Sequence, residues 1–419
     1  MLKQKISGHI FWHTEQTKKK KEVNMRNLLA FIVSVCLMIP APMQPICLAD
    51  EGSATVVAVG DHIVHGAVYT DAKRNAATLT STSEECVAYS FDEMYGRVTD
   101  MIRRADLAII NQEGPVTYRP PSGYPLFNAP AELMPALARA GFDVVNLANN
   151  HALDMDAGGK QGGLADTRRL VKEQGLIPIG TYASPEEKGE ITTVEKNGVT
   201  VALLSYTFFT NGLSEPTGAS FGVKRWEEAT VCREVTEASR ISDFVIVSVH
   251  WGEEGANKPN ETQRCAAKLL AEWGADVILG HHPHVLQPIE WIEREGGRTL
   301  VAYSLGNFLS AMLYPHHMVG GILSFTLKKE THTVEDVCFI PTVCHYERAV
   351  SAATDGKTLK TRRGISVYPL YEYTEELAGR HGTGLYAEIS LRKIYAIVED
   401  AIDPDFLFKH DALGAHSGK

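Results

Sequence analysis

Short, largely apolar runs recur along this chain and predict the strands of a buried sheet. The run over residues 142–147 is the clearest, because it contains the β-branched pair Val144-Val145 and is too short for a helix. Four other runs have the same character: residues 56–59, 107–110, 244–249 and 277–279.

Segments with a helical spacing of apolar residues lie between these runs. Residues 131–140 place Leu133, Leu137 and Ala140 on one face, and Gly141 then ends the helix. Three more segments are predicted to be helical: residues 84–103, 162–174 and 261–273. The alternation of strands and helices as far as about residue 310 predicts a layered α/β fold.

Two pairs of segments have the pattern of antiparallel strands. Residues 192–195 and 199–205 flank Asn197-Gly198, which is a strong signal for a hairpin. Residues 320–327 and 334–341 form a second pair. This second pair would close the sheet, so we expect a mixed sheet core with helices around it.

Each of the five apolar runs ends in residue types that bind metal ions. The five clusters are Gly60-Asp61-His62 with His65 following, Asn111-Gln112-Glu113-Gly114, Ala148-Asn149-Asn150-His151, His250-Trp251-Gly252 and Gly280-His281-His282-Pro283-His284. Open α/β sheets bind their ligands at the carboxyl ends of the strands. One cluster could be a turn capped by its asparagines, but five are hard to explain as separate turns.

The acids, amides and imidazoles of these clusters form a mixed nitrogen and oxygen ligand set. Its members are Asp61, His65, Glu113, Asn150, His250, His282 and His284. Such a set suits zinc, manganese or iron. Seven ligands are too many for one tetrahedral ion and suit two divalent ions bridged by a carboxylate, for which we choose Glu113. Two such ions can hold an oxyanion and lower the pKa of a water.

The charge of the chain disfavours one class of partner. The formal net charge is −10, but the first 49 residues carry +5, so the remainder holds −15. An acidic body argues against a nucleic-acid partner, because phosphate backbones require clustered Lys and Arg. An anionic substrate would be held by metal and local dipoles instead of the overall field.

The first 49 residues predict a secretory signal peptide or an N-terminal anchor. Lys18–Lys21 and Arg26 precede an apolar stretch over residues 28–39, and Ala49 is a candidate cleavage point. Met25 is a second candidate start, which would leave residues 1–24 upstream. Three prolines interrupt the length of about 20 apolar residues that a spanning anchor needs. We therefore expect a secreted or extracytoplasmic protein, with anchoring through this segment as the alternative.

Five cysteines follow this segment, and none of them forms a CxxC pair. They are Cys86, Cys232, Cys265, Cys338 and Cys344. An odd number leaves at least one free thiol if the others pair, and Cys338 with Cys344 could close a hairpin. A zinc site built from thiolates is disfavoured.

The motifs resemble the CapA family of poly-γ-glutamate capsule biosynthesis proteins, a branch of the calcineurin-like metallophosphoesterase superfamily. In the family's order, over about residues 55–310, the matching pieces are AVGDHIVHG, NQEGP, GYPLFNAP, AGFDVVNLANNHALD, VSVHWGEE, GADVILGHHPHVLQP and YSLGNF. The resemblance implies a layered metallophosphatase-like sandwich over residues 50–350, with a mixed sheet core flanked by helices. A C-terminal extension over residues 351–419 would follow, partly helical at residues 394–402.

The resemblance also implies how the ligands divide between the ions. Glu113 would bridge both ions, and Asp61 and His284 would bind the first. The second ion would be held by residues of two later motifs and the bridge: Asn150, His250 and His282. The superfamily's first motif often reads Asp-x-His, but the third position here is Ile63, and His65 would replace the missing ligand.

The catalytic group implied by the resemblance is His151, which would protonate the leaving group while Asp154 orients it. His62 and His281 could compete as ligands, although packing or hydrogen bonding near the site is the alternative for both. Trp251 would form a pocket wall unless it packs in the core.

Two further assignments concern the surroundings of the site. Asn307 would contact substrate unless it caps a turn. Glu253 and Glu254 are interpreted as a solvated face.

Two functions follow from these residues. The first is a dinuclear metal hydrolase outside the cytoplasm, acting on poly-γ-glutamate, a related envelope polymer or a phosphoester. The second is a non-catalytic subunit that binds the polymer during assembly or export, with a structural metal site and membrane-bound capsule synthesis partners. The Asn150-His151 pair counts against the second function, because a structural site has no use for a general acid.

Overall fold

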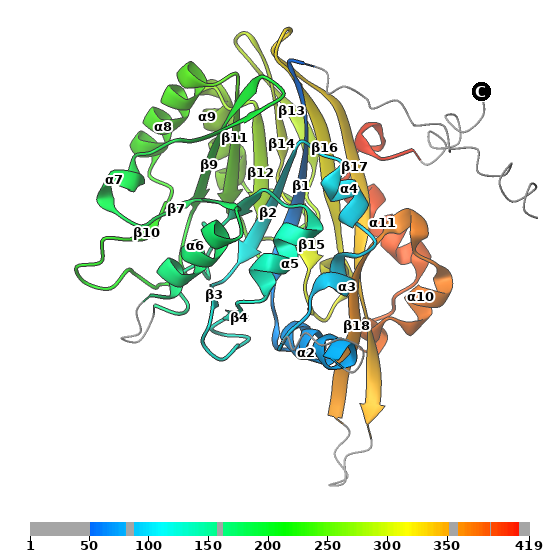
Figure 1. Cartoon of the computed structure of the whole chain (residues 1–419). Helices are drawn as coiled ribbons and strands as arrows, with labels where there is room; N and C mark the ends of the chain where they lie inside the picture. Colours follow the sequence, from blue (N-terminus) through cyan, green and yellow to red (C-terminus); the bar gives the residue numbers. More distant parts are fainter. Residues whose placement is uncertain (1–50, 81–87, 157–161, 352–358, 386, 410–419) are drawn as a thin grey trace, which may run out of the picture. The chain divides into compact units, whose positions relative to one another are not determined.

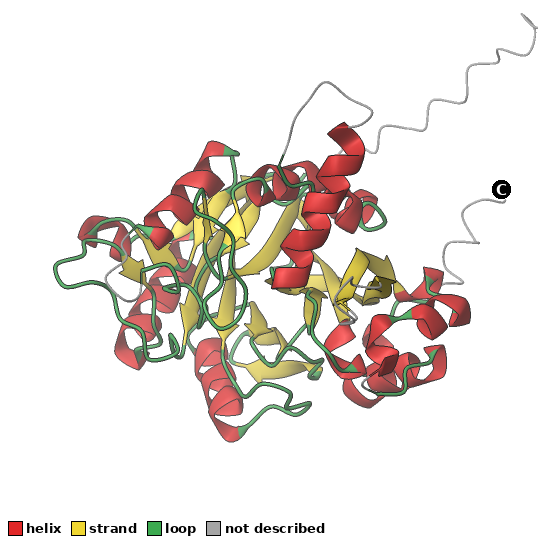
Figure 2. Ribbon diagram, turned by 90° about the horizontal axis from the view of Figure 1, so that it is seen from below, coloured by secondary structure: helices red, strands yellow, loops and turns green. Residues whose placement is uncertain are grey.

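Two mixed β-sheets face each other in this computed structural model, and helices cover their outer faces (Figures 1 and 2). The structure describes residues 51–80, 88–156, 162–351, 359–385 and 387–409. The predicted targeting segment, residues 1–49, lies outside the described residues. Within the described ranges, every helix is too short or too polar to cross a membrane.

The first sheet has the strand order β18-β17-β16-β1-β2-β5-β6, and β15 also pairs with β1. The run from β1 to β6 is parallel, whereas β16, β17 and β18 are antiparallel to their neighbours. Its strands are β1 (Ser53–Ile63), β2 (Leu107–Glu113), β5 (Val144–Asn146), β6 (Ile177–Ile179), β15 (Asn307–Leu309), β16 (Val319–Lys328), β17 (Thr333–Ser351) and β18 (Leu359–Pro369).

The second sheet has the order β13-β14-β12-β11-β9-β8. Its four central strands are parallel, and an antiparallel strand lies at each edge. The strands are β8 (Thr192–Lys196), β9 (Val199–Thr207), β11 (Phe244–His250), β12 (Val277–His281), β13 (Ile289–Arg294) and β14 (Gly297–Ala302). Two short pairs accompany the sheets: β3 (Val116–Thr117) with β4 (Ala129–Pro130), and β7 (Thr181–Tyr182) with β10 (Gly222–Val223).

Helices α2 to α6 contribute to the core on the outer face of the first sheet, and α8 and α9 to the core on the outer face of the second. The last two helices, α10 and α11, add side chains to the core between the sheets. The helices are α2 (Gly66–Thr80), α3 (Asp92–Tyr95), α4 (Thr99–Arg103), α5 (Leu133–Ala140), α6 (Gly163–Glu173), α7 (Pro185–Lys188), α8 (Glu228–Ile241), α9 (Glu261–Glu272), α10 (Glu375–Arg380) and α11 (Leu391–Ala401). Short 3₁₀ helices are η1 (Pro315–Met318), η2 (Leu370–Glu372), η3 (Gly382–Leu385) and η4 (Pro404–Phe406).

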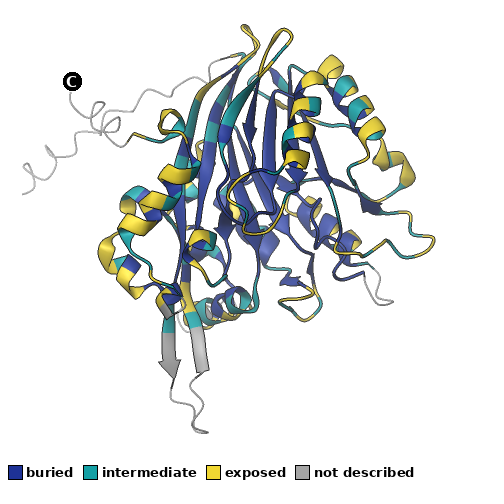
Figure 3. Ribbon diagram, turned by 180° about the vertical axis from the view of Figure 1, so that it is seen from behind, coloured by how far each residue is buried: buried dark blue, intermediate teal, exposed yellow. Residues whose placement is uncertain are grey.

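Strand β1 shows why the sheets are layered in this way. Val57 and Val59 pack against the helices on one face, while Val56 and Ala58 pack between the sheets on the other. All four are buried, as the dark blue central strands of Figure 3 show. A strand that is apolar on both faces must be covered on both faces, and each fully buried valine stabilises the fold by about 1.5–3 kcal/mol.

Most of the predicted elements are confirmed. The five apolar runs lie in β1, β2, β5, β11 and β12, and three predicted helices are α5, α6 and α9. Both antiparallel pairs form, as β8 with β9 and β16 with β17. The helix expected near the C-terminus is α11. The layered α/β architecture with mixed sheets flanked by helices is therefore confirmed.

The single helix predicted over residues 84–103 is wrong for the residues that the structure describes. The chain forms the short helices α3 and α4, separated by Gly96 to Val98. Val98 has a φ of −111°, well away from the value of about −63° of a regular helix. Glycine weakens a helix interior by about 1 kcal/mol, which favours a break at Gly96. Residues 84–87 lie outside the described residues.

The cysteine pairing considered above does not form. Cys338 and Cys344 are both free thiols, and the Cys344 thiol donates a hydrogen bond to the Ser310 carbonyl at 3.1 Å. Cys232 and Cys265 are also free, and Cys86 lies outside the described residues.

We expect Gly280→Ala to destabilise the protein by about 3 kcal/mol or more, because overpacking a buried site strains the backbone. A β-carbon at this position of β12 would lie 1.9 Å from the Tyr303 carbonyl oxygen and 2.7 Å from Trp251 Nε1. Urea unfolding would measure the loss. Gly189→Ala is the control, because a β-carbon there meets no atom within 4 Å. Equal unfolding midpoints for the two variants would contradict the expectation.

Candidate metal centre

The carboxyl ends of parallel strands from both sheets meet at one place. Asp61 belongs to β1 and Glu113 to β2, whereas His250 ends β11 and His284 follows β12. Asp61 Oδ2 lies 3.1 Å from His284 Nδ1, and Glu113 Oε1 lies 3.6 Å from His284 Nε2 and 4.0 Å from His250 Nε2. The predicted convergence of distant loops is therefore present in the structure.

Two groups of ligand atoms share one carboxylate. Asp61, Glu113 and His284 form the first group, and Glu113, His250 and His282 form the second. Within each group the candidate ligand atoms lie within 4.8 Å of one another. This arrangement is consistent with a metal site in which Glu113 is shared, and the division of ligands between two ions stays a prediction.

Asn150 adds an oxygen to the second group. Its Oδ1 lies 3.0 Å from His250 Nε2, and both residues are at most 1% exposed. Asn149 holds this loop in place, because its side chain donates to the Gln112 carbonyl at 2.8 Å and accepts the His151 N–H at 3.1 Å. The loop after β5 is thus tied to the end of β2, which carries Glu113.

The backbone around Pro283 turns the two histidines to different groups. His282 has a φ of 97° and His284 a φ of 58°, which lie in the left-handed region. Such conformations cost on the order of 1–3 kcal/mol and cluster at functional sites. The His282 N–H donates to Asp61 Oδ2 at 3.1 Å, which fixes this turn against β1.

Buried polar atoms that lack a hydrogen-bond partner indicate whether these residues can hold a cation. Among the described residues, both Glu113 oxygens and the Nδ1 atoms of His250 and His282 have no hydrogen-bond partner. Buried polar groups are normally satisfied, and an unpaired buried carboxylate is costly. A cation within each of the two ligand groups would compensate the Glu113 charge, so the residues fit a pair of divalent ions.

The pKa values of Glu113, His250, His282 and His284 are also shifted by burial and by neighbouring charges. Burial raises the pKa of Glu113 to about 7. Burial also lowers the pKa of His282 to about 3 and holds that of His250 well below its usual value, so both rings are neutral. Burial opposes protonation of His284, but attraction by Glu113 and the hydrogen bond to Asp61 raise its pKa to about 10. Metal ligands must be deprotonated, so binding would release this proton.

Two neighbouring histidines, His62 and His281, lie outside both ligand groups. His62 donates from Nδ1 to Gln112 Oε1 and accepts the Tyr95 hydroxyl at Nε2, both at 2.7 Å. Both ring nitrogens are therefore used for hydrogen bonds. His281 is 2% exposed, and its Nδ1 lies 3.4 Å from Asp61 Oδ1. Burial would raise the pKa of Asp61, but the adjacent His281 and His284 rings outweigh it and hold this pKa well below its usual value.

His65 does not join either group, contrary to the predicted replacement of a ligand at position 63. Its Nδ1 accepts the Ala311 N–H at 3.3 Å, and its ring packs edge-on against Phe127. The local backbone explains this. Strand β1 ends at Ile63, and the chain then turns into α2, where the His65 carbonyl accepts the Val68 N–H.

His151 and Asp154 form a hydrogen-bonded pair beside the two groups. The His151 Nδ1–H donates to Asp154 Oδ2 at 2.8 Å, which leaves Nε2 available. Burial lowers the pKa of His151, but the hydrogen bond to Asp154 and the charge of Glu113 outweigh it, so its pKa is raised. The geometry matches a proton donor whose ring is oriented by a carboxylate.

Two residues around His151, Phe127 and Asn211, were not predicted as part of the site. The Phe127 ring lies edge-on to the His151 ring, with 4.7 Å between the ring centroids. The Phe127 backbone N–H donates to Asp154 Oδ2 at 2.7 Å. Asn211 Nδ2 lies 3.5 Å from His151 Nε2. Phe127 lies in the motif GYPLFNAP, which is a usable signal, whereas no pattern in the sequence marks Asn211.

The two residues predicted to contact substrate are both 0% exposed, so these assignments are corrected. Trp251 packs in the core of the second sheet, and its Nε1–H donates to the Tyr303 carbonyl at 3.0 Å. Asn307 Oδ1 lies 3.0 Å from His284 Nδ1, and its Nδ2 donates to the His317 carbonyl at 2.9 Å. Asn307 therefore orients a candidate ligand and does not face a substrate.

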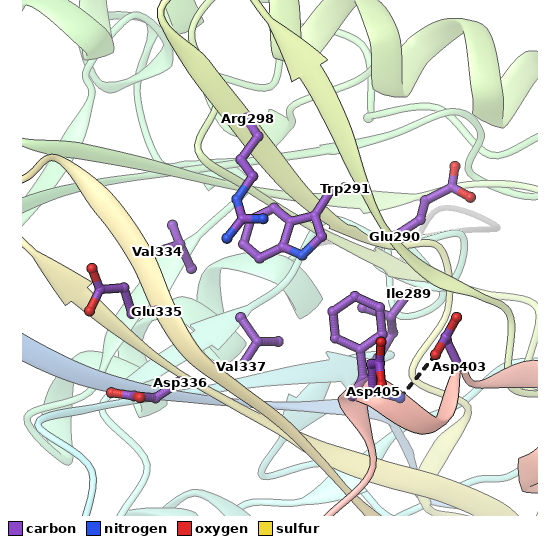
Figure 4. A pocket seen from close by; sticks show the side chains of 11 residues that line it. Ile289, Glu290, Trp291, Arg298, Val334, Glu335, Asp336, Val337, Asp403 and Asp405 are labelled. Atoms are coloured by element: carbon purple, nitrogen blue, oxygen red, sulfur yellow. Dashed lines mark hydrogen bonds between the residues drawn. The ribbon is translucent and has the colours of Figure 1, made fainter.

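A pocket of about 560 Å³ lies elsewhere, where β13 and β14 meet β17 and η4 (Figure 4). Arg298 stacks at 3.8 Å on Trp291, and carboxylates such as Glu335 and Asp403 line the same pocket. None of its lining residues belongs to the two ligand groups. The pocket is therefore separate from the candidate centre.

We expect the purified protein to bind two divalent cations per chain. Glu113→Gln should weaken both sites by at least about tenfold, because Glu113 belongs to both groups, whereas Asp61→Asn should weaken one. Equilibrium dialysis against Mn²⁺ with elemental analysis measures both constants. The loss of a single ion in Glu113→Gln would contradict the shared carboxylate.

We expect Asp154→Asn to lower the pKa of His151 in the metal-free protein. The substitution keeps an acceptor oxygen but removes the charge that favours the protonated ring. Proton NMR of the histidine ring would follow the titration. Asp100→Asn, at an exposed position of α4, is the control and should leave the pKa of His151 unchanged. An unaltered titration in Asp154→Asn would show that the pair does not set the pKa.

Comparison with known proteins supports the resemblance noted in the sequence. Residues 55–312 match the family model of the bacterial capsule synthesis protein PGA_cap. The chain is 32% identical over 252 residues to the PGA biosynthesis protein CapA of Bacillus subtilis, covering 57% of this chain and 62% of that one. It is 30% identical over 259 residues to the capsule biosynthesis protein CapA of Bacillus anthracis, covering 59% and 61%. The chain thus spans about three fifths of the length of these relatives.

Solved structures that are similar include a phosphatase from Mycoplasma pneumoniae, at 15% identity and a TM-score of 0.39, covering 70% of this chain and 94% of that one. Another is a 5'-nucleotidase precursor from Thermus thermophilus, at 16% identity and a TM-score of 0.40, covering 69% and 54%. Because the family model matches more than half of the sequence, the chain belongs to the bacterial capsule synthesis protein PGA_cap family.

Proposed function

We propose that this protein is a metal-dependent hydrolase that acts outside the cytoplasm on an anionic envelope polymer such as poly-γ-glutamate. One observation carries the proposal: two ligand groups share Glu113, and the His151–Asp154 pair lies beside them. A structural metal site needs ligands alone, whereas this arrangement adds a group that can donate a proton. Metal-dependent hydrolysis is faster when both parts are present.

The chain's own residues divide the work between holding cations and moving a proton. Asp61 and His284 would hold one cation, His250, His282 and Asn150 the other, and Glu113 both. When bound, such a pair polarises the bond to be cleaved and lowers the pKa of a water. His151, oriented by Asp154, would donate a proton from Nε2 to the departing group. Burial lowers the pKa of His151, but the hydrogen bond to Asp154 outweighs it and favours the protonated ring.

The names of the relatives support a capsule polymer as the substrate. The proteins from Bacillus subtilis and Bacillus anthracis are named for PGA biosynthesis and for capsule biosynthesis. The acidic body of this chain would repel a polyanion at long range, so local groups and the cations would hold it. A γ-glutamyl amide and a phosphoester are the two bonds that we propose to compare.

The basic and apolar N-terminal segment supports a site of action outside the cytoplasm. We propose that this segment directs export, either as a cleaved signal or as an anchor. An anchored protein would work beside membrane-bound partners of capsule synthesis.

A second candidate is a polymer-binding subunit with a structural metal site. Deep burial of the ligands favours it, since Glu113 is 1% and His250 0% exposed. The His151–Asp154 pair counts against it, because polymer binding gives no reason to orient a proton donor next to the ions. The two candidates differ in one measurable property, which is turnover.

We expect His151→Ala to lower kcat by about 10²- to 10⁴-fold while both cations stay bound. Generic phosphodiesters and γ-glutamyl peptides, each supplied with Mn²⁺ or Zn²⁺, form the substrate panel. His332→Ala is the matched control, because this exposed histidine stacks on Phe244 at the turn between β16 and β17. If the wild-type protein binds both cations but cleaves no member of the panel, the polymer-binding candidate is favoured.

A further inference from the structure

Glu254 lies on the solvent side of the candidate centre. Glu253 and Glu254 were predicted to form a solvated face, and both are exposed. Unlike Glu253, however, Glu254 forms a third group of ligand atoms with His282 and His284, all within 4.8 Å of one another. His284 belongs to the first group and His282 to the second, so the Glu254 carboxylate lies close to both.

The loop that carries Glu254 is fixed to the turn between the two histidines. The Gly255 N–H donates to the Pro283 carbonyl at 2.9 Å. Gly252 and Gly255 have φ values of 84° and 76°, which let the chain turn sharply on each side of the glutamates. The position of Glu254 therefore follows from backbone contacts with the residue that separates His282 from His284.

A count of ligands shows which cation has room for an additional carboxylate. The second group has four candidate ligands when Asn150 is included, but the first has only Asp61, Glu113 and His284. Three protein ligands leave a position that water, substrate or a further carboxylate can take, and manganese takes more oxygen ligands than zinc does. His65, the other residue considered for this place, uses its Nδ1 to accept the Ala311 N–H and joins no group.

We propose that Glu254 is a further ligand of the cation held by Asp61, Glu113 and His284, and that it closes the centre on its solvent side. This inference rests on the metal centre of the proposed function. A carboxylate on an exposed loop loses less of its hydration than a buried one. It can therefore yield its place to an anionic group of a substrate more readily than Asp61 or Glu113 can.

The test compares Glu254→Gln with Glu253→Gln, a substitution of the same type at the adjacent exposed position. The full chain is stripped with a chelator and titrated with Mn²⁺, and free Mn²⁺ is counted by electron paramagnetic resonance. We expect wild type and Glu253→Gln to bind two ions alike. Glu254→Gln should weaken one site by about tenfold or more and leave the other unchanged. Thermal unfolding in chelator should be the same for all three, because Glu254 is exposed.

A third variant, His65→Ala, distinguishes the two candidates for the same place. A loss of affinity in His65→Ala with none in Glu254→Gln would overturn the assignment. Two ions in wild type with unchanged constants in Glu254→Gln would overturn the role of Glu254 alone. A wild-type protein that binds no Mn²⁺ or Zn²⁺ would overturn the metal centre, and the role of Glu254 with it.

Discussion

The site depends on one constraint, which is the burial of a carboxylate that has no hydrogen-bond donors around it. Glu113 is 1% exposed at the end of β2, and neither of its oxygens has a hydrogen-bond partner among the described residues. A charge in such surroundings is tolerated only beside an opposite charge, or it takes up a proton. Its raised pKa and the protonated state of His284 are two results of this one imbalance.

Much of this arrangement could be predicted from the sequence because two strong signals agree. Apolar runs such as residues 244–249 identify buried strands, and parallel strands end at a common edge of a sheet. Polar residues that follow these runs, such as Asp61 and His250, must then lie near one another. The identity of the shared carboxylate could also be predicted, since Glu113 is the acid at the end of the second strand.

Other features depend on tertiary contacts that no local pattern encodes. Helix α2 was not predicted, because the face it buries consists of Val68, Ala72 and Ala76, which are too small to give a clear apolar stripe. Trp251 directly follows β11 and Asn307 begins β15, but both side chains are fully buried. Glu254 has the sequence context of a solvated acid, and only the hydrogen bond from Gly255 to Pro283 brings it to the histidines.

The distance along the chain between the ligands has a consequence for metal selection. Asp61 and His282 are 221 residues apart; Asp61 lies in the first sheet, and His282 follows β12 of the second. The unfolded chain therefore does not bring these two ligands together, and the complete ligand set forms only once both sheets have formed. Cation binding would then be coupled to the completed fold, and chelation would lower its stability.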